Sequence, residues 1–166
     1  MKSRLFFFFL TVLTMSLSGT ATAQEYQNAL GLRLGYPLSV SYKHFVNDNG
    51  HALEGYLGFR DYRAGSWVNI SGAYQVHRAI SEVDRLYFYY GGGASLVFWN
   101  YNDNFPFDDD YARVAVGLQG YLGLDYNFKD APVNVSLDWV PTFFLRGYSR
   151  GFGADYGSLS VRYILD

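Results

Sequence analysis

The stretch LYFYYGGGASLVFWN, Leu86 to Asn100, places four consecutive aromatic residues and three consecutive glycines before a second apolar run. Each glycine inside a helix costs about 1 kcal/mol relative to alanine, so Gly91 to Gly93 argue against a helix. Read with a period of two, the stretch separates into two unlike faces. One face holds Leu86, Phe88, Tyr90, Ala94, Leu96 and Phe98, and the other holds Tyr87, Tyr89, Gly91, Gly93 and Ser95. This pattern predicts a β-strand.

The same alternation runs through the rest of the chain from residue 28. Seven further segments carry it: NALGLRLGY (28–36), LSVSYKHF (38–45), HALEGYLGF (51–59), SWVNISGAYQV (66–76), RVAVGLQGYLGLDYNF (113–128), VNVSLDWVPTFFL (133–145) and YGSLSVRYIL (156–165). Helical periodicity does not produce such a pattern. The sequence therefore predicts an all-β fold, an eight-stranded antiparallel up-and-down barrel. An even number of strands lets the barrel close with both termini at one end.

The N-terminal segment is typical of a cleaved secretory signal peptide. Lys2 and Arg4 precede the apolar run Leu5 to Leu17, and Ala21-Thr22-Ala23 supplies the small residues of a cleavage site. The alternative, a membrane anchor, needs roughly 17–25 apolar residues, and this run is shorter. We expect residues 1–23 to be removed and residues 24–166 to form one barrel domain.

Charge and cysteine content exclude several classes of protein. Removal of Lys2 and Arg4 leaves 11 basic and 15 acidic residues, which argues against a nucleic-acid partner. The sequence has no cysteine, so it forms no disulfide and no thiolate metal site. We predict neither a cofactor nor a metal.

The composition of the less apolar face separates two kinds of eight-stranded barrel. In a soluble ligand-binding barrel of the lipocalin type this face meets water and carries many charged residues. Here it is mainly Gly, Ser, Ala and Asn, and the only lysines after the signal are Lys43 and Lys129. The opposite face is almost continuously aliphatic or aromatic, and a cationic residue at mid-membrane on that face would cost about 2–4 kcal/mol. The sequence predicts a transmembrane barrel with its small and polar face inward.

Connections and aromatic residues predict which end faces outward. The longest irregular connections, 100–111 and 147–153, fall on one side, as in barrels whose long loops are extracellular and whose termini are periplasmic. Aromatic residues near strand ends predict two girdles. The periplasmic girdle would hold Tyr42, Phe45, Tyr87, Phe88, Tyr126, Phe128 and Tyr163, and the outer one Tyr36, Phe59, Trp67, Phe98, Trp99, Phe143 and Phe144.

Strand number, outward apolar alternation and loop asymmetry resemble those of the small bacterial outer-membrane barrels, of the OmpX-like and OmpA transmembrane-domain type. The resemblance covers residues 24–166 and carries no local motif. It implies a monomer in the outer membrane of a Gram-negative bacterium, in contact with outer-membrane lipid and lipopolysaccharide and inserted by the barrel-assembly machinery. Such barrels usually end on an aromatic residue, whereas this chain ends on Asp166.

Charged residues on the inward face are the strongest candidate site. They are Arg33, Lys43, Glu54, Arg113, Asp125, Asp138 and Arg162. A hairpin at Asn47 to Gly50 sets Lys43 beside Glu54, and a last hairpin centred near Arg150 sets Asp138 opposite Arg162. Because an isolated buried charge is costly, we expect a largely paired network that fills a narrow lumen. The alternative interpretation is a gate or proton path.

The histidines give no catalytic motif. Outer-membrane barrels that deacylate lipid A carry a His-x-Ser arrangement, in which the imidazole activates a hydroxyl. The three histidines here are followed by other residues, in His44-Phe45-Val46, His51-Ala52-Leu53 and His77-Arg78-Ala79. We predict that the protein is not an enzyme and that it has no catalytic residues.

The loop WNYNDNFPFDDDY, 99–111, is the main candidate for binding at the surface. It contains Asp103, Asp108, Asp109 and Asp110, without the ligand spacing and glycine of a calcium loop. We interpret it as a solvated loop that, with residues 147–153, contacts an extracellular partner. The sequence thus favours a structural or surface-interaction role. A narrow porin-like channel is the alternative, and a lipid-modifying enzyme is the third reading.

Overall fold

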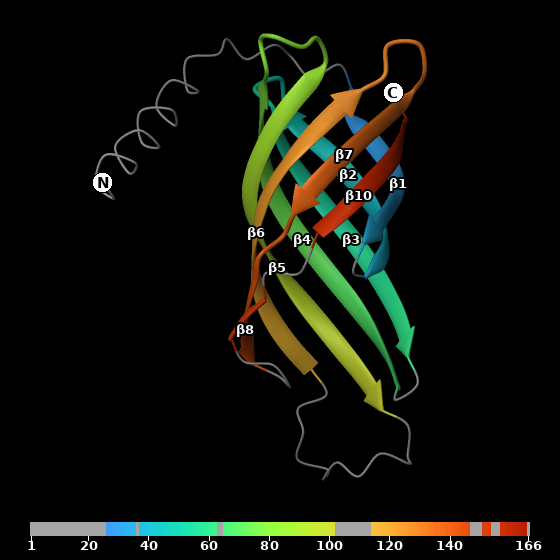
Figure 1. The fold of residues 1–166 in the computed structure, drawn as a ribbon, viewed down its shortest axis with the longest axis vertical. Coiled ribbons are helices and arrows are strands. Elements are labelled where there is room, and N and C mark those ends of the chain that lie inside the picture. Colours follow the sequence, from blue (N-terminus) through green and yellow to red (C-terminus); the bar gives the residue numbers. More distant parts are fainter. Residues whose placement is uncertain are drawn as a thin grey trace, which may run out of the picture.

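The computed structural model describes residues 26–35, 37–62, 65–101, 114–146, 151–153 and 157–165, which form a closed antiparallel β-barrel of eight strands (Figure 1). The first six barrel strands are β1 (Asn28–Gly35), β2 (Leu38–Asn47), β3 (His51–Tyr62), β4 (Gly65–Ala79), β5 (Leu86–Tyr101) and β6 (Val114–Asn127). The seventh is β7 (Val133–Trp139) continued by β8 (Thr142–Arg146), and the eighth is β9 (Gly151–Gly153) continued by β10 (Gly157–Ile164). Each barrel strand pairs with its neighbours in sequence.

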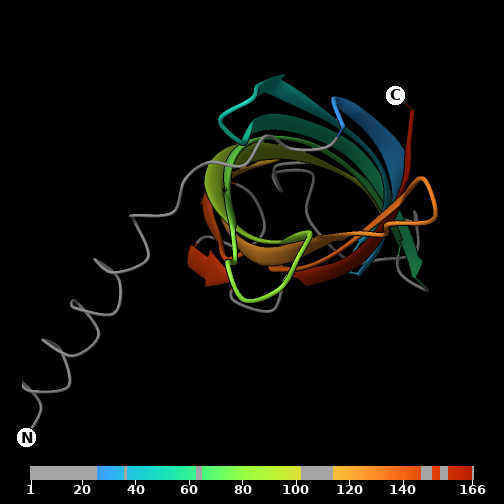
Figure 2. The same cartoon turned by 90° about the horizontal axis from the view of Figure 1, so that it is seen from above.

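Pairing of β1 with β10 closes the barrel, and the view along its axis shows the resulting ring (Figure 2). The predicted fold class, an eight-stranded antiparallel barrel with up-and-down connections, is therefore confirmed. Within the described residues no helix is long and apolar enough to cross a membrane.

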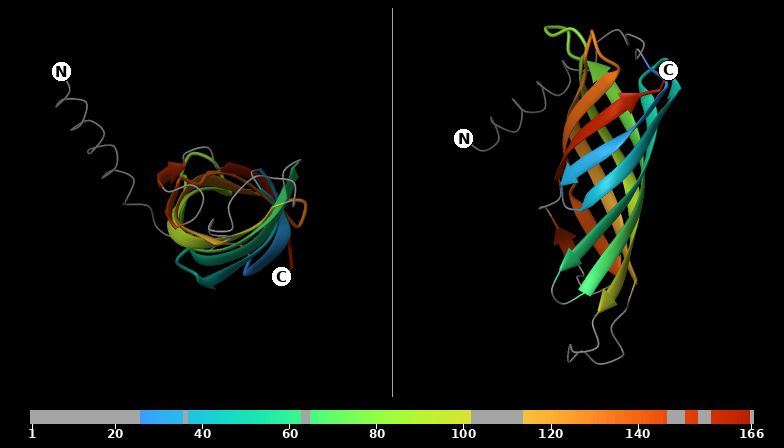
Figure 3. Two further views of the ribbon diagram at one scale, coloured as in Figure 1. Left: turned by 90° about the horizontal axis from the view of Figure 1, so that it is seen from below. Right: turned by 90° about the vertical axis from the view of Figure 1, so that its right-hand side faces the viewer.

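The strands are strongly tilted (Figure 3). A row of paired residues that starts at Arg33 runs around the barrel through Ser39 and Gly58 and reaches β4 at Asn69. Followed around the barrel in the opposite direction, the row from Arg33 reaches β4 at Ala79, 10 residues from Asn69. With the usual spacings within and between strands, this offset corresponds to a tilt of about 40°. Side chains that share a hydrogen-bonded row therefore lie at different heights in the barrel.

Three connections lie at the end where β1 begins and β10 ends (Figure 1). The turn at 48–50 uses Gly50, whose φ of 79° is accessible to glycine without steric cost. Within this turn the side-chain oxygen of Asn47 accepts a hydrogen bond from the backbone N–H of Asn49, at 3.1 Å. The connections at 80–85 and 128–132 are the other two.

The seventh barrel strand is interrupted at Val140 and Pro141, where the sequence alone indicated one continuous strand. Proline has no N–H to donate to a neighbouring strand. Its carbonyl oxygen still accepts from the backbone N–H of Gly120, at 2.9 Å. The segments on either side, β7 and β8, consequently both pair with β6.

The predicted facing is observed along most of each strand. Inward positions of β2, β6 and β10 are buried in alternation with exposed apolar side chains. The prediction was wrong for five of the girdle residues, which point into the lumen. Phe45, Tyr87 and Trp67 are at most 5% exposed, and Trp99 and Phe144 line a cavity inside the barrel. Tyr36 lies outside the described residues.

The central glycines of β5 provide a matched test of this geometry. A Cβ on Gly93, which faces inward, would lie 2.3 Å from the carbonyl oxygen of Gly72, whereas a Cβ on the adjacent Gly92 would meet nothing closer than 3.8 Å. We expect Gly93→Ala to lower the free energy of unfolding by about 1–3 kcal/mol because of the clash with backbone. Gly92→Ala should be neutral or slightly stabilising. Urea unfolding of the two folded variants measures this difference, and equal midpoints would contradict the assigned facing.

Candidate functional site: a hydrogen-bonded network in the lumen

Six of the seven predicted lumen charges lie inside the barrel. Their exposures are 3% for Arg33, 0% for Lys43, 2% for Glu54, 0% for Asp125, 6% for Asp138 and 1% for Arg162. Arg113 lies outside the described residues, and so do the loop aspartates Asp103, Asp108, Asp109 and Asp110. The period-two facing of the strands brings these six groups into one lumen.

Glu54 on β3 is the centre of one half of the network. Its Oε1 accepts from Nη1 of Arg33 at 3.1 Å and from Nη2 of Arg162 at 2.5 Å. Its Oε2 accepts from Nε2 of Gln75 at 2.8 Å. Charge-assisted bonds of this kind are the strong ones in proteins, and here two guanidinium groups share one carboxylate.

Asp138 on β7 binds the other side of Arg33. Nη2 of Arg33 donates to both carboxylate oxygens of Asp138, at 3.1 and 2.9 Å. The same carboxylate accepts the Tyr89 hydroxyl at 2.6 Å and both the backbone N–H and the hydroxyl of Ser158. Each lone-pair direction of this buried carboxylate is therefore occupied, as burial of a charge requires.

Lys43 and Asp125 form the third ion pair, at 3.1 Å between Nζ and Oδ2. His77 approaches the same carboxylate at 3.6 Å and stacks on the ring of Tyr89, with 4.8 Å between ring centroids. The amide of Asn134 donates to Asp125 and its oxygen accepts from Arg162, at 3.2 Å for the latter bond. Through Asn134 the Lys43–Asp125 pair joins the Glu54 half.

These contacts connect one side chain or more from every barrel strand. We call this set the lumen network: Arg33, Lys43, Glu54, Gln75, His77, Tyr89, Asp125, Asn134, Asp138 and Arg162. Three cationic and three anionic side chains balance one another in it, His77 aside. Because these bonded side chains extend from one wall of the barrel to the other, the interior of this barrel is packed.

The two predicted cross-strand pairs have different outcomes. Lys43 is directly opposite Glu54, as predicted, although its closest carboxylate belongs to Asp125 across the lumen. The prediction that Asp138 is opposite Arg162 was wrong: Asp138 is opposite Ser158, and Arg162 is opposite Asn134. The pairing of β7 with β10 is shifted by four residues from the expected register, an even number, so facing is preserved while the partners change.

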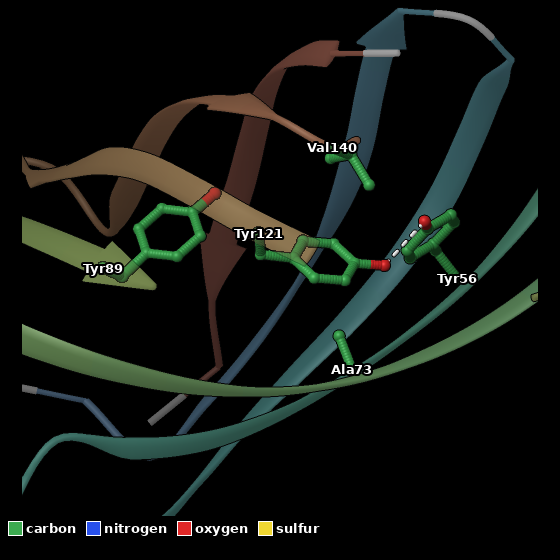
Figure 4. Close-up of a cluster of buried hydrophobic side chains, with 5 residues drawn as sticks. All are labelled: Tyr56, Ala73, Tyr89, Tyr121 and Val140. Carbon is green, nitrogen blue, oxygen red and sulfur yellow. Dashed lines mark hydrogen bonds between the residues drawn. The ribbon is translucent and has the colours of Figure 1, made fainter. Parts of the chain in front are cut away.

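A layer of tyrosines adjoins the lumen network (Figure 4). The hydroxyls of Tyr56 and Tyr121 point toward each other and are 2.8 Å apart, and both contact Oε1 of Gln119. Tyr56 also lies under the guanidinium of Arg33, 4.7 Å from its ring centroid. This cation–π contact joins the tyrosine layer to the charges.

Four members of the lumen network are absent from the sequence-based candidate list: Gln75, His77, Tyr89 and Asn134. The signal was available for all of them. Gln75 and His77 lie two and four residues after the inward-facing Ala73 on β4, so alternation places them inside. Asn134 is likewise two residues from the inward-facing Ser136 on β7. None of the four carries a fixed charge, so charge on the inward face does not single them out.

Within the described residues, no histidine forms a hydrogen bond with a serine. His44 bonds to Asn28 at 2.9 Å, His51 bonds to the hydroxyl of Tyr74, and His77 belongs to the lumen network. No group of three or more potential metal ligands occurs among the described residues. Compared with known proteins, this chain matches no family model, no curated protein and no solved structure.

Proposed function

We propose that this chain is an integral outer-membrane barrel whose lumen is closed by its own side chains, and that it has a structural or surface-interaction role at the end away from its termini. The signal segment expected at residues 1–23 would direct its export. In this proposal the chain performs no catalysis. Its immediate surroundings are lipid and lipopolysaccharide.

The observation that carries this proposal is the inverted polarity of the barrel. Between the two rims, the outward positions of the described strands are aliphatic, aromatic, alanine or glycine, and many of the large side chains are about half exposed. Examples are Leu57 at 58%, Val40 at 51% and Leu137 at 60%. A water-soluble monomer rarely exposes contiguous apolar patches above a few hundred Å². A hydrocarbon environment removes that cost, and this is the pattern of membrane barrels.

The closed lumen favours a plug over a channel. Ion passage needs a continuous water path, whereas the lumen network and the Tyr56–Tyr121 layer cross this bore. We therefore expect the protein, folded into planar bilayers, to produce no discrete unit currents. A large porin in the same bilayers serves as the positive control. Reproducible ion-selective currents from the folded protein would contradict the closed lumen and favour the narrow channel.

A further inference from the structure

A small cavity opens at the end of the barrel away from the termini. Its volume is about 50 Å³, room for roughly four water molecules, and it is partly open. Side chains from most of the barrel strands line it, among them Arg33, Ser95 and Trp99. It lies beside the tyrosine layer, since Tyr56 and Gln119 are also in its lining.

One wall of the cavity is aromatic. Trp67 and Trp99 lie against each other with ring centroids 5.5 Å apart and an interplanar angle of 35°. Val97 and Phe144 complete this wall. Indole rings offer a broad flat apolar surface together with one polar edge, so they favour ligands that are apolar on one face and polar at the rim.

Deeper in the barrel, below the tryptophans on β4 and β5, the cavity carries uncharged hydrogen-bonding groups. Oγ of Ser95, which is 2% exposed, has no hydrogen-bond partner in the described structure. The side-chain oxygens of Asn69 and Gln119 accept hydrogen bonds from hydroxyls within the protein, which leaves the amide NH₂ groups of these two cavity-lining residues available as donors. Buried polar groups are normally paired, so the partner of the Ser95 hydroxyl is a molecule in the cavity, either water or a ligand that displaces it.

The positive charge of Arg33, which lines the cavity, is already neutralised within the protein. Its guanidinium is bonded to both Glu54 and Asp138. A free anion would have to compete with two carboxylates at about 3 Å for that guanidinium. The cavity therefore offers hydroxyl and amide groups beside an indole face, with no uncompensated charge.

We propose that this cavity binds one ring of a neutral saccharide. The apolar C–H face of a sugar ring packs on indole, and its hydroxyls form hydrogen bonds with groups such as Ser95, Asn69 and Gln119. At about 50 Å³ the cavity holds only the hydroxyl edge of a ring, and the rest of the ring extends out of its open side along Trp67 and Trp99. The inference deepens the proposed function and rests on it, because it takes this end of the barrel to face the cell exterior, where glycans are presented.

Two of the three tryptophans of the chain line the cavity, which makes intrinsic fluorescence a direct readout. The third, Trp139, is 46% exposed on the outer wall, and Trp139→Phe removes its signal. The full chain with this substitution is folded in a zwitterionic detergent, since sugar-based detergents would compete. It is titrated with the methyl glycosides of glucose, galactose, mannose and N-acetylglucosamine. We expect a saturable change with at least one of them.

Two serine variants in this background test the site itself. Ser95→Ala removes a hydroxyl that bonds to no other group within the described residues, so the fold should be unaffected while the dissociation constant rises about three- to tenfold. Ser160→Ala is the matched control, because Ser160 is equally buried in the lumen but does not line the cavity. Its affinity should equal that of the parent.

Three results would overturn the saccharide site. They are the absence of a saturable change with all four glycosides, equal affinity for sorbitol, which has hydroxyls but no ring face, and preference for the methyl glucuronide anion. Folding is checked first by the heat-dependent gel shift of the barrel. If the folded barrel binds none of the glycosides, only the saccharide site is contradicted. If the folded chain is soluble without detergent, the proposed function is contradicted as well.

Discussion

Replacing Glu54 by glutamine is expected to lower the free energy of unfolding by about 3–5 kcal/mol. Glu54 is 2% exposed, and its carboxylate is shared by Arg33 and Arg162. Glutamine keeps the shape but removes the charge. The two buried guanidinium groups then have one carboxylate between them, that of Asp138, which pairs with Arg33, and Arg162 is left with uncharged partners only. An uncompensated buried charge is the costly result of breaking such a pair.

The measurement is urea unfolding of the protein in lipid vesicles, followed by gel shift. Glu82→Gln is the matched control, because Glu82 is exposed in the 80–85 connection and should leave the midpoint unchanged. If the two variants unfold at the same urea concentration, the lumen network contributes nothing to stability. The interpretation of this network as the packed core of the barrel would then be wrong.

Leu57→Arg should cost about 2–4 kcal/mol in a bilayer. Leu57 lies in the middle of β3 and points outward with 58% of its surface exposed, so a guanidinium there would have to enter hydrocarbon. In water the same substitution at such an exposed position would be nearly neutral. The expected loss therefore distinguishes a lipid-facing wall from a water-facing one.

The depth control is Phe128→Arg, at a residue that is 45% exposed and directly follows β6 at the rim. Near the interface the cost should fall to about 0–1 kcal/mol. Vesicle unfolding of both variants gives the comparison. A similar small effect at both positions is the outcome that would exclude hydrocarbon around the centre of the barrel.

Alternation in the sequence was sufficient to predict the fold and the facing of the charges. Glu54 and Asp125 could be placed inside because each alternates with large apolar neighbours on its own strand, such as Leu53 and Leu124. The errors at Phe45 and Tyr87 came from assigning aromatics by their distance to a strand end. Parity would have placed Phe45 inside, since it follows the inward-facing Lys43 by two residues.

The partners within the lumen could not be read from the sequence. Because the ring closes with an offset of 10 residues, side chains far apart in any hydrogen-bonded row meet across the bore. Lys43 thus contacts Asp125 on β6, although Glu54 is its cross-strand neighbour. The last hairpin adds a second uncertainty, since alternation fixes facing but allows a slip of an even number of residues. Such a slip pairs Arg162 with Asn134 instead of Asp138.

Folding into lipid vesicles tests the central claim, that this is a membrane barrel, most directly. The chain without residues 1–23 is diluted from urea into buffer with or without vesicles and run on a gel before and after boiling. We predict a faster-migrating, heat-sensitive band that forms only with vesicles, because the apolar outer wall needs hydrocarbon to fold against. A folded, water-soluble monomer in plain buffer would contradict the account.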